Sequence, residues 1–192
     1  IAHGRHRRPL HGIPITYKDM FATSGVRTTG ASKILLDWVP NFDAHIVERL
    51  DAAGAILIGK TNLDEFGHGG TSTLSHFGPV HNPWNTARIG PLPYGTETGS
   101  SVRRPASYCG IVGFKPTFGI ISRYGSFRGA WSQDHVGIFA RSVKDVALGL
   151  DATAGHDSRD PSSVQQNSPT YASHLDGNVK GLRLAGRRPF LR

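Results

Sequence analysis

Two short strands joined by a helix are predicted by the spacing of apolar residues in the first third of the chain. Residues 13–17 and 55–59 form short apolar runs, which are typical of buried strands. Between them, apolar positions recur at helical spacing over residues 46–53. We expect Asp43 to cap the start of this helix and Gly54 to follow its end. Strand, helix and strand in this order predict a parallel α/β sheet.

Further elements are predicted towards the end of the chain. Ser142 is placed to cap a helix whose inward positions would be Val143, Val146, Ala147 and Leu150. Residues 62–68 favour a short helix, and residues 179–184 favour another strand. Between about 155 and 173 the chain is polar, which predicts a surface connection.

The middle of the chain has a different character, because glycine and proline are dense from Pro83 to Pro105. That density of helix breakers predicts that no ordinary helix forms there. Within it, residues 95–103 read Gly-Thr-Glu-Thr-Gly-Ser-Ser-Val-Arg, a stretch of small residues with consecutive hydroxyls. Small side chains leave backbone N–H groups accessible, as an anion or oxyanion site requires.

Net charge invites a nucleic-acid hypothesis, but the charge distribution disfavours it. The chain of 192 residues has 38% hydrophobic residues and a formal net charge of +8. Seven of its 22 basic residues lie in two tails, residues 1–8 and 183–192, so the body between them is close to neutral. We interpret residues 1–8 and 185–192 as basic tails on a single partial domain, and nucleic acid as an unlikely partner.

Cysteine content and hydropathy exclude other classes. Cys109 is the single cysteine, which excludes an internal disulfide framework and a cysteine-rich zinc site and favours a cytoplasmic setting. No apolar run approaches the roughly 18 residues of a membrane span, so no membrane partner is expected. The ten histidines show no metal spacing, and His76 and His81 are interpreted as loop residues. We therefore expect no metal site.

Two features of the sequence suggest nucleophilic chemistry. Lys18 ends a predicted buried strand, and burial favours the neutral form of a lysine, which can act as a base. Ser100 and Ser101 lie in the small-residue loop, and lysine with serine is a known hydrolase combination. Alone the signal is weak: Lys60 also ends a strand, either lysine could be a surface residue, and the serines could form a turn.

Several motifs occur in an order that resembles the amidase signature family. They are Gly12 to Asp19, Gly59 to Asn62, Glu65-Phe66, Asn82 to Trp84, Gly95 to Pro105, Cys109-Gly110 and Gly113 to Thr117. The resemblance covers about residues 5–184. It implies an α/β fold, a mixed β-sheet flanked by helices in α/β/α layers, and hydrolysis of carbon–nitrogen amide bonds.

The resemblance also implies roles for individual residues. The family uses a Ser–cis-Ser–Lys triad, whose nucleophile corresponds to Ser101 and whose lysine corresponds to Lys18. Backbone N–H groups of Thr98, Gly99 and Ser100, with that of Ser101, would form the oxyanion hole. Lys18 would draw a proton through the bridging serine while Ser101 attacks the amide and forms an acyl-enzyme. The family implies a small amide substrate, no cofactor, and either a homo-oligomer or amidotransferase subunits as partners.

The chain departs from the family pattern where the bridging serine is expected. Residues 87–95, Ala-Arg-Ile-Gly-Pro-Leu-Pro-Tyr-Gly, replace the family's Gly-Gly-Ser-Ser-Gly-Gly-Ser stretch and the small-residue helix after it. Segments of the family are also missing at both ends. We therefore expect a truncated, internally deleted and impaired hydrolase. The alternative is a catalytically inactive remnant or a partner-binding subunit of an amidase or amidotransferase.

Other residues receive structural interpretations. We expect Cys109 to be a buried small apolar residue and Arg103 to support the loop by hydrogen bonds. Asp19 is expected either to pair with Lys18 or to cap a neighbour. Three tryptophans are assigned to packing: Trp38, Trp84 and Trp131.

Overall fold

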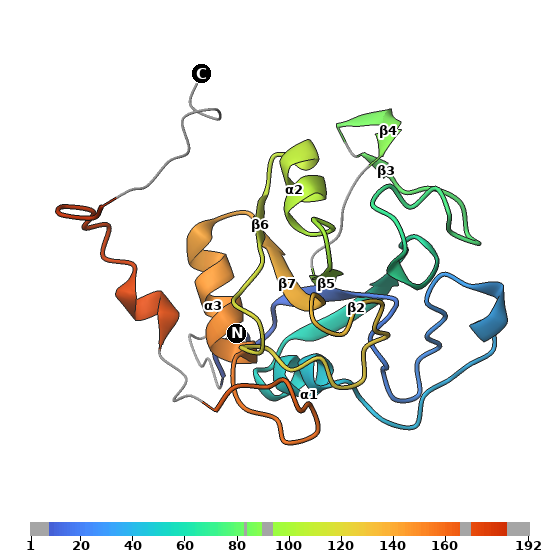
Figure 1. Ribbon diagram of the computed structural model, residues 1–192, viewed down its shortest axis with the longest axis horizontal. Coiled ribbons are helices and arrows are strands. Elements are labelled where there is room, and N and C mark those ends of the chain that lie inside the picture. Colours follow the sequence, from blue (N-terminus) through green and yellow to red (C-terminus); the bar gives the residue numbers. More distant parts are fainter. Residues whose placement is uncertain (1–7, 83, 90–93, 166–169, 184–192) are drawn as a thin grey trace.

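A computed structural model describes residues 8–82, 84–89, 94–165 and 170–183 (Figure 1). Three helices are defined in these residues: α1 (His45–Ala52), α2 (Arg103–Cys109) and α3 (Val143–Thr153). The strands are β1 (Pro14–Lys18), β2 (Ile56–Thr61), β3 (His81–Asn82), β4 (Asn85–Ile89), β5 (Tyr94–Glu97), β6 (Val112–Phe114) and β7 (His135–Ala140). Short 3₁₀ turns cover Lys33–Leu35, Glu65–Gly67 and Tyr171–His174. No helix in the described ranges could cross a membrane.

The predicted parallel unit is confirmed. Strands β1 and β2 pair in parallel, from Pro14 opposite Ile56 to Lys18 opposite Thr61, and α1 connects them. The apolar side of α1 is buried at Ile46, Val47 and Leu50, as its helical spacing predicts. Lys18 is thereby placed at the carboxyl end of β1, where side chains of a parallel unit reach a site.

The predicted N-cap of α1 is wrong, whereas the predicted glycine at its end is confirmed. Ala44, rather than Asp43, is the N-cap residue, and it provides no side-chain hydrogen bond. The Asp43 carboxylate instead accepts a hydrogen bond from the backbone N–H of Ser24 at 2.7 Å, so it fastens a neighbouring turn. Gly54 follows the helix with a φ of 84°, the left-handed conformation that ends many helices.

The α/β fold class is confirmed, with parallel and antiparallel strands placed in separate sheets. Strands β5, β7 and β6 form an antiparallel sheet with β7 in the middle, and β3 pairs with β4 in a hairpin. Strand β5 lies beside β1, while α3 packs on β7 and α2 packs on β6. One apolar core connects the β1–α1–β2 unit with β7 and α3 through Tyr17, Leu50, Ile138 and Leu150. The N-terminal unit and the antiparallel sheet therefore hold the site between them.

Helix α3 begins at the predicted cap, but its first residue is exposed instead of buried. The Ser142 hydroxyl accepts a hydrogen bond from the Asp145 N–H at 3.1 Å, which confirms the cap. Val146, Ala147 and Leu150 are buried as predicted, whereas the predicted inward position of Val143 is wrong, since Val143 is 59% exposed like the rest of the first turn.

Strand β2 is less buried than its apolar run predicts. Ile56 and Ile58 alternate on one face of the strand and are 52% and 67% exposed. Ile13, just before β1, is also half exposed. The apolar run therefore has one face on the core and leaves the other uncovered by the described residues.

Three further expectations need correction. Residues 62–68 form only the short turn Glu65–Gly67, and α2 begins at Arg103, inside the stretch predicted to lack a helix. Its Pro105 lies in the first turn, where a missing N–H leaves no helical bond unmade. The described part of residues 179–184 contains no strand. The polar connection after residue 155 lies mostly at the surface, as predicted, and two buried acids anchor it: Asp157 and Asp160 accept hydrogen bonds from Ser122 and from the backbone of Arg123.

The start of α1 is clamped by a glycine, which gives a stability prediction. Gly125 has a φ of 76°, and a Cβ atom there would stand 2.5 Å from Ala44 Cα. Gly25 has a similar φ of 71° but open space around it. We expect Gly25→Ala to lower the free energy of unfolding by about 1 kcal/mol and Gly125→Ala to cost about 1–3 kcal/mol more. Urea unfolding of both variants measures the difference, and equal losses would contradict the clamp.

Candidate active site

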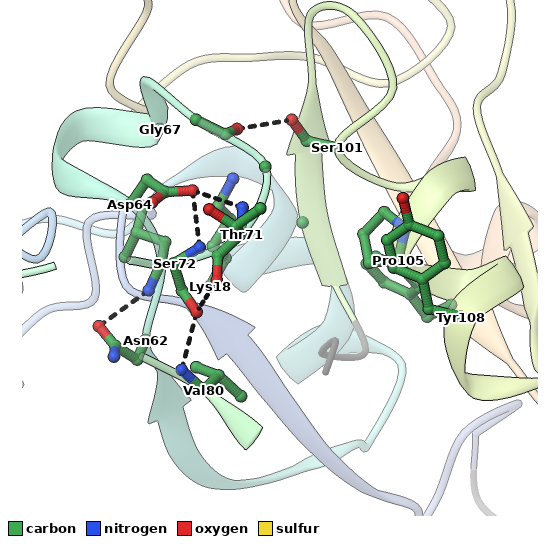
Figure 2. A pocket seen from close by; sticks show the side chains of 15 residues that line it. Lys18, Asn62, Asp64, Gly67, Thr71, Ser72, Val80, Ser101, Pro105 and Tyr108 are labelled. Carbon is green, nitrogen blue, oxygen red and sulfur yellow. Dashed lines mark hydrogen bonds between the residues drawn. The ribbon is translucent and has the colours of Figure 1, made fainter. Parts of the chain in front are cut away.

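One cavity brings together residues that lie far apart along the chain (Figure 2). Lys18 comes from the end of β1 and Ser101 from the loop after β5, so the two predicted catalytic residues line the same cavity. The cavity opens to solvent. Its other walls come from the loop after β2, from β7 and from α2, as Asn62, Asp64, Phe139, Pro105 and Tyr108.

A second cavity adjoins the first and shares Gly67, Gly69 and Ser101 with it. The predicted oxyanion loop, Thr98 to Ser101, lines this second cavity. Ser101 therefore stands where the two spaces meet, accessible from both. The first cavity, with a few polar groups in a mainly apolar wall, is typical of a small-molecule site, and the second adds a more polar space beside it.

The environment of Lys18 matches that of a lysine base. Burial lowers the pKa of Lys18 to about 8, although the carboxylates of Asp64 and Asp134 partly oppose this shift. With that pKa, about a tenth of the lysine is neutral at pH 7. The direction agrees with the sequence-based expectation for a lysine at the end of a buried strand.

The partner of Lys18 is a residue that the sequence analysis missed. Lys18 Nζ donates a hydrogen bond to Thr96 Oγ1 at 3.1 Å, and Thr96 Oγ1 lies 2.9 Å from Met20 Sδ. Strand β5 places Thr96 there because it lies beside β1. The hydroxyl of Thr96, two residues before the serine loop, could have indicated this partner. The sequence, however, predicted a loop where the structure has strand β5.

Ser101 has no hydrogen bond to Lys18 in the described part of the chain. Its hydroxyl donates to the backbone carbonyl of Gly69 at 3.4 Å, a long contact. The side chain is half-buried and keeps access to the cavity. The structure thus brings the predicted nucleophile and base to one space without joining them.

The backbone of the serine loop is open to a ligand. None of the N–H groups of residues 98–101 donates to another described residue. The next two, those of Val102 and Arg103, both donate to Glu97 Oε2, at 3.1 and 3.0 Å. The four preceding N–H groups therefore have no acceptor among the described residues, and the oxyanion role of Thr98, Gly99 and Ser100 stays a prediction.

Glu97 is the buried anchor of this loop. Burial alone would raise its pKa, but hydrogen bonds from Arg103 and Val102 outweigh burial and hold the pKa below its usual range. Arg103 Nε donates to Glu97 Oε1 at 2.7 Å, and its Nη2 forms an ion pair with the same oxygen. The expected supporting role of Arg103 is confirmed. Glu97 was missed, although a lone acid in a small-residue stretch could have indicated it.

Asp134 holds the loop from the other side. It accepts the Thr98 hydroxyl at 2.5 Å and the N–H groups of Gly129 and Ala130 at 2.7 and 2.9 Å. Thr98 is therefore fixed through its side chain while its N–H stays open. Two carboxylates, Glu97 and Asp134, thus set the backbone of the loop.

The second lysine that ends a strand has a structural environment. Lys60 Nζ donates to Phe21 O at 2.7 Å and to Thr28 Oγ1 at 2.8 Å, and it lies 3.4 Å from Asp19 Oδ1. Asp19 therefore pairs with Lys60 and accepts hydrogen bonds from Thr29, rather than pairing with Lys18. Every donor position of Lys60 is occupied, which leaves Lys18 as the lysine facing the cavity.

Other candidate groups receive their environments from the fold. Cys109 is buried and burial raises the pKa of its thiol, so it fits the expected packing residue rather than a nucleophile. Trp38 packs against Phe127, but Trp84 is 82% exposed and Trp131 is 59% exposed, so packing was wrong for these two. No group of three His, Cys, Asp or Glu side chains in the described ranges could hold a metal ion.

Comparison with known proteins decides the family. A family model described as Amidase matches residues 1–191. The chain belongs to the amidase family. This amidase chain is 48% identical over 192 residues to a subunit of the glutamyl-tRNA(Gln) amidotransferase of Geobacter metallireducens, covering 92% of the chain and 40% of that relative. It is 44% identical over 200 residues to the corresponding subunit of Carboxydothermus hydrogenoformans, covering 96% and 41%.

Solved structures support the amidase fold. One, described as a vestigial protein complex that reveals the evolutionary origins of an s-triazine catabolic enzyme, has a TM-score of 0.89 and 39% identity, covering 95% of this chain and 44% of that chain. The peptide amidase of Stenotrophomonas maltophilia has a TM-score of 0.79 and 33% identity, covering 90% and 40%. The amidase chain thus spans about two fifths of the length of these relatives.

Proposed function

We propose that this chain carries the amide-hydrolysing site of its family, with Ser101 as nucleophile and Lys18 as base. The observation that carries the proposal is one cavity lined by a lysine of lowered pKa and by Ser101, beside a loop whose N–H groups are open. This combination supplies base, nucleophile and oxyanion donors, the three requirements of acyl transfer.

The proposed reaction proceeds in two half-reactions. Neutral Lys18 takes up the proton of the Ser101 hydroxyl while the serine oxygen bonds to the amide carbon. The carbonyl oxygen becomes an oxyanion held by backbone N–H groups of residues 98–101. Collapse breaks the carbon–nitrogen bond, and the proton leaves with the amine. Water then adds to the acyl-serine and releases the carboxylic acid and Ser101.

We propose that the first step is slow in this chain. Lys18 is hydrogen-bonded to Thr96 and Ser101 to Gly69, so no hydrogen-bonded route among the described residues carries the proton between them. The family's bridging serine has no equivalent in the sequence, and Gly90 to Pro93, at the junction, lie outside the described residues. Loss of one member of a triad leaves mainly oxyanion stabilisation and substrate binding to accelerate the reaction.

Substrate and partners follow from the relatives at the level of class. The curated relatives are named as subunits of an amidotransferase, and one solved relative is a peptide amidase. We therefore propose a small amide as substrate and an assembly with amidotransferase-type subunits or with further copies of the chain.

A second candidate function is that of an inactive, partner-binding subunit. Two observations favour it: the missing bond between Lys18 and Ser101, and the exposed apolar face at Ile13, Ile56 and Ile58. Exposed apolar surface of this kind is typical of a contact with another chain or segment. This candidate predicts an unreactive Ser101, so one measurement separates the two.

That measurement is covalent labelling with a fluorophosphonate probe, followed by intact mass and peptide mapping. The probe reports activation of a serine without knowledge of the substrate. We expect one adduct per chain, on Ser101. A folded chain that gains no adduct would support the inactive subunit, and an adduct on another serine would overturn the assignment.

A further inference from the structure

We propose that Arg104 selects substrates that carry a carboxylate, and that it binds this carboxylate at the mouth of the cavity beside Ser101. The inference rests on the proposed function, because it names the substrate class of the same site. It follows from the position of Arg104, from its lack of a partner among the described residues, and from the charges around it.

Arg104 is held at the junction of the two cavities. Its backbone N–H donates to the Ser100 carbonyl at 2.9 Å, which fixes it three residues after Ser101. Its side chain lines the second cavity together with Ser101. The guanidinium lies against Gly70, where a Cβ atom would collide with Nη2, and Gly70 lines the first cavity. The charge of Arg104 therefore stands at the edge of both spaces.

The guanidinium has no acceptor in the described part of the protein. Four Lys, Arg or Asp side chains line the two cavities: Lys18, Asp64, Arg104 and Asp134. Lys18 is bonded to Thr96, whereas the Arg104 side chain has neither a hydrogen bond nor an ion pair with a described residue. Its neighbour Arg103, by contrast, is fully engaged with Glu97.

The two carboxylates that line the cavities are each bound by three donors other than Arg104. Asp64 accepts the N–H groups of Thr71, Ser72 and Leu74 at 2.8–3.0 Å. Asp134 accepts the three donors described above. Neither carboxylate forms a hydrogen bond or an ion pair with Arg104, so the five N–H groups of its guanidinium remain for a ligand.

A carboxylate is the ligand that this arrangement fits. A guanidinium binds a carboxylate through two parallel hydrogen bonds, and it stays charged at every physiological pH. Lys18, with a pKa of about 8, must lose its proton to act as a base, so it is not a permanent counter-charge for an anion. An amide whose far end carries a carboxylate would place its carbonyl at Ser101 and its charge at Arg104.

A matched pair of ligands tests the proposal directly. Succinamate and succinamide share a carbon skeleton and an amide, and only succinamate has a carboxylate. Their affinities for the whole chain are measured by ligand-observed NMR titration, which does not require turnover. We expect succinamate to bind more tightly than succinamide, and Arg104→Gln to weaken succinamate about tenfold to a hundredfold without changing succinamide.

Three further variants separate recognition from general charge and from folding. Arg141→Gln removes an exposed arginine that lines neither cavity, and it should leave both affinities unchanged. Arg104→Lys keeps the charge but loses the paired geometry, so its affinity for succinamate should be intermediate. Gly70→Ala should also weaken succinamate, because its methyl group displaces the guanidinium, a flexible end that can move without loss of stability.

The outcomes distinguish this inference from the proposed function. Equal affinities for the two ligands, no binding of succinamate, or unchanged succinamate binding in Arg104→Gln would overturn the role of Arg104. Arg104-dependent binding in a chain whose Ser101 takes no fluorophosphonate would support the anion site and refute the hydrolase. Labelling of Ser101 without a preference for succinamate would do the reverse.

Discussion

Ser101→Ala is expected to abolish the fluorophosphonate adduct completely, while Ser100→Ala retains it. Ser101 is the serine that lines both cavities, and its hydroxyl is the group that would bond to phosphorus. Ser100 differs by one position, lies in the same loop and would keep its backbone N–H as alanine, so the proposed oxyanion donors are unaffected. The readout is the mass of the intact chain after equal exposure to the probe.

Each outcome of this pair has a definite meaning. An adduct that persists in Ser101→Ala would show that another serine is activated, and the assignment from the motif would fail. Loss of the adduct in both variants would point to a disturbed loop rather than to a missing nucleophile. Melting curves of the two variants check that the fold is retained. We expect little loss of stability in Ser101→Ala, because the one hydrogen bond of the Ser101 hydroxyl among the described residues is the long contact to Gly69.

Lys18→Met is expected to slow labelling of Ser101 by about a hundredfold or more, the usual contribution of a general base. As the pH is raised towards 8, the labelling rate of the native chain should rise about tenfold per pH unit, and above pH 8 it should level off. This direction follows from the proposed role of neutral Lys18 as the base, because its pKa is about 8 and its neutral fraction falls tenfold for each pH unit below the pKa. The pH profile is measured by quenching the labelling reaction after set times at several pH values between 6 and 10.

The free energy of unfolding provides the control for Lys18→Met, because we expect the substitution to raise stability while it lowers the labelling rate. The Lys18 pKa is about 8 in the folded chain and 10.5 as an ordinary value, so between these pH values the unfolded chain binds more protons. Stability therefore rises with pH through this window, and below pH 8 the folded protein bears the full cost of the buried charge. Lys18→Met removes that cost, up to about 3 kcal/mol at pH 7.

A variant that is slower to react yet harder to unfold cannot owe its slowness to unfolding. Lys18→Arg adds a second comparison, because it keeps the positive charge but does not release a proton in this pH range. It should be as slow as Lys18→Met. Labelling at the native rate in Lys18→Arg, or a flat pH profile in the native chain, would contradict the role of Lys18 as a base.

Local sequence pattern determined the parts of the fold that depend on neighbours in the chain. The spacing of Ile46, Val47 and Leu50 defines the buried side of α1, and Ser142 caps α3 through the N–H three residues later. Both depend on helical geometry, which repeats over a few residues and is therefore visible in the sequence. The order of motifs likewise indicated the family and selected Ser101 and Lys18 as the residues to test.

Tertiary structure alone decided which partner each functional group has. Lys18 and Lys60 end adjacent strands and look alike in the sequence, yet Lys60 is enclosed by Asp19, Phe21 and Thr28 while Lys18 faces the cavity. The Lys18 bond to Thr96 spans 78 positions of the chain. The sequence likewise did not show that Arg104 has no partner among the described residues. The physical reason is that burial and hydrogen-bond partners come from segments remote in sequence, whose approach is set by packing of the whole fold rather than by local periodicity.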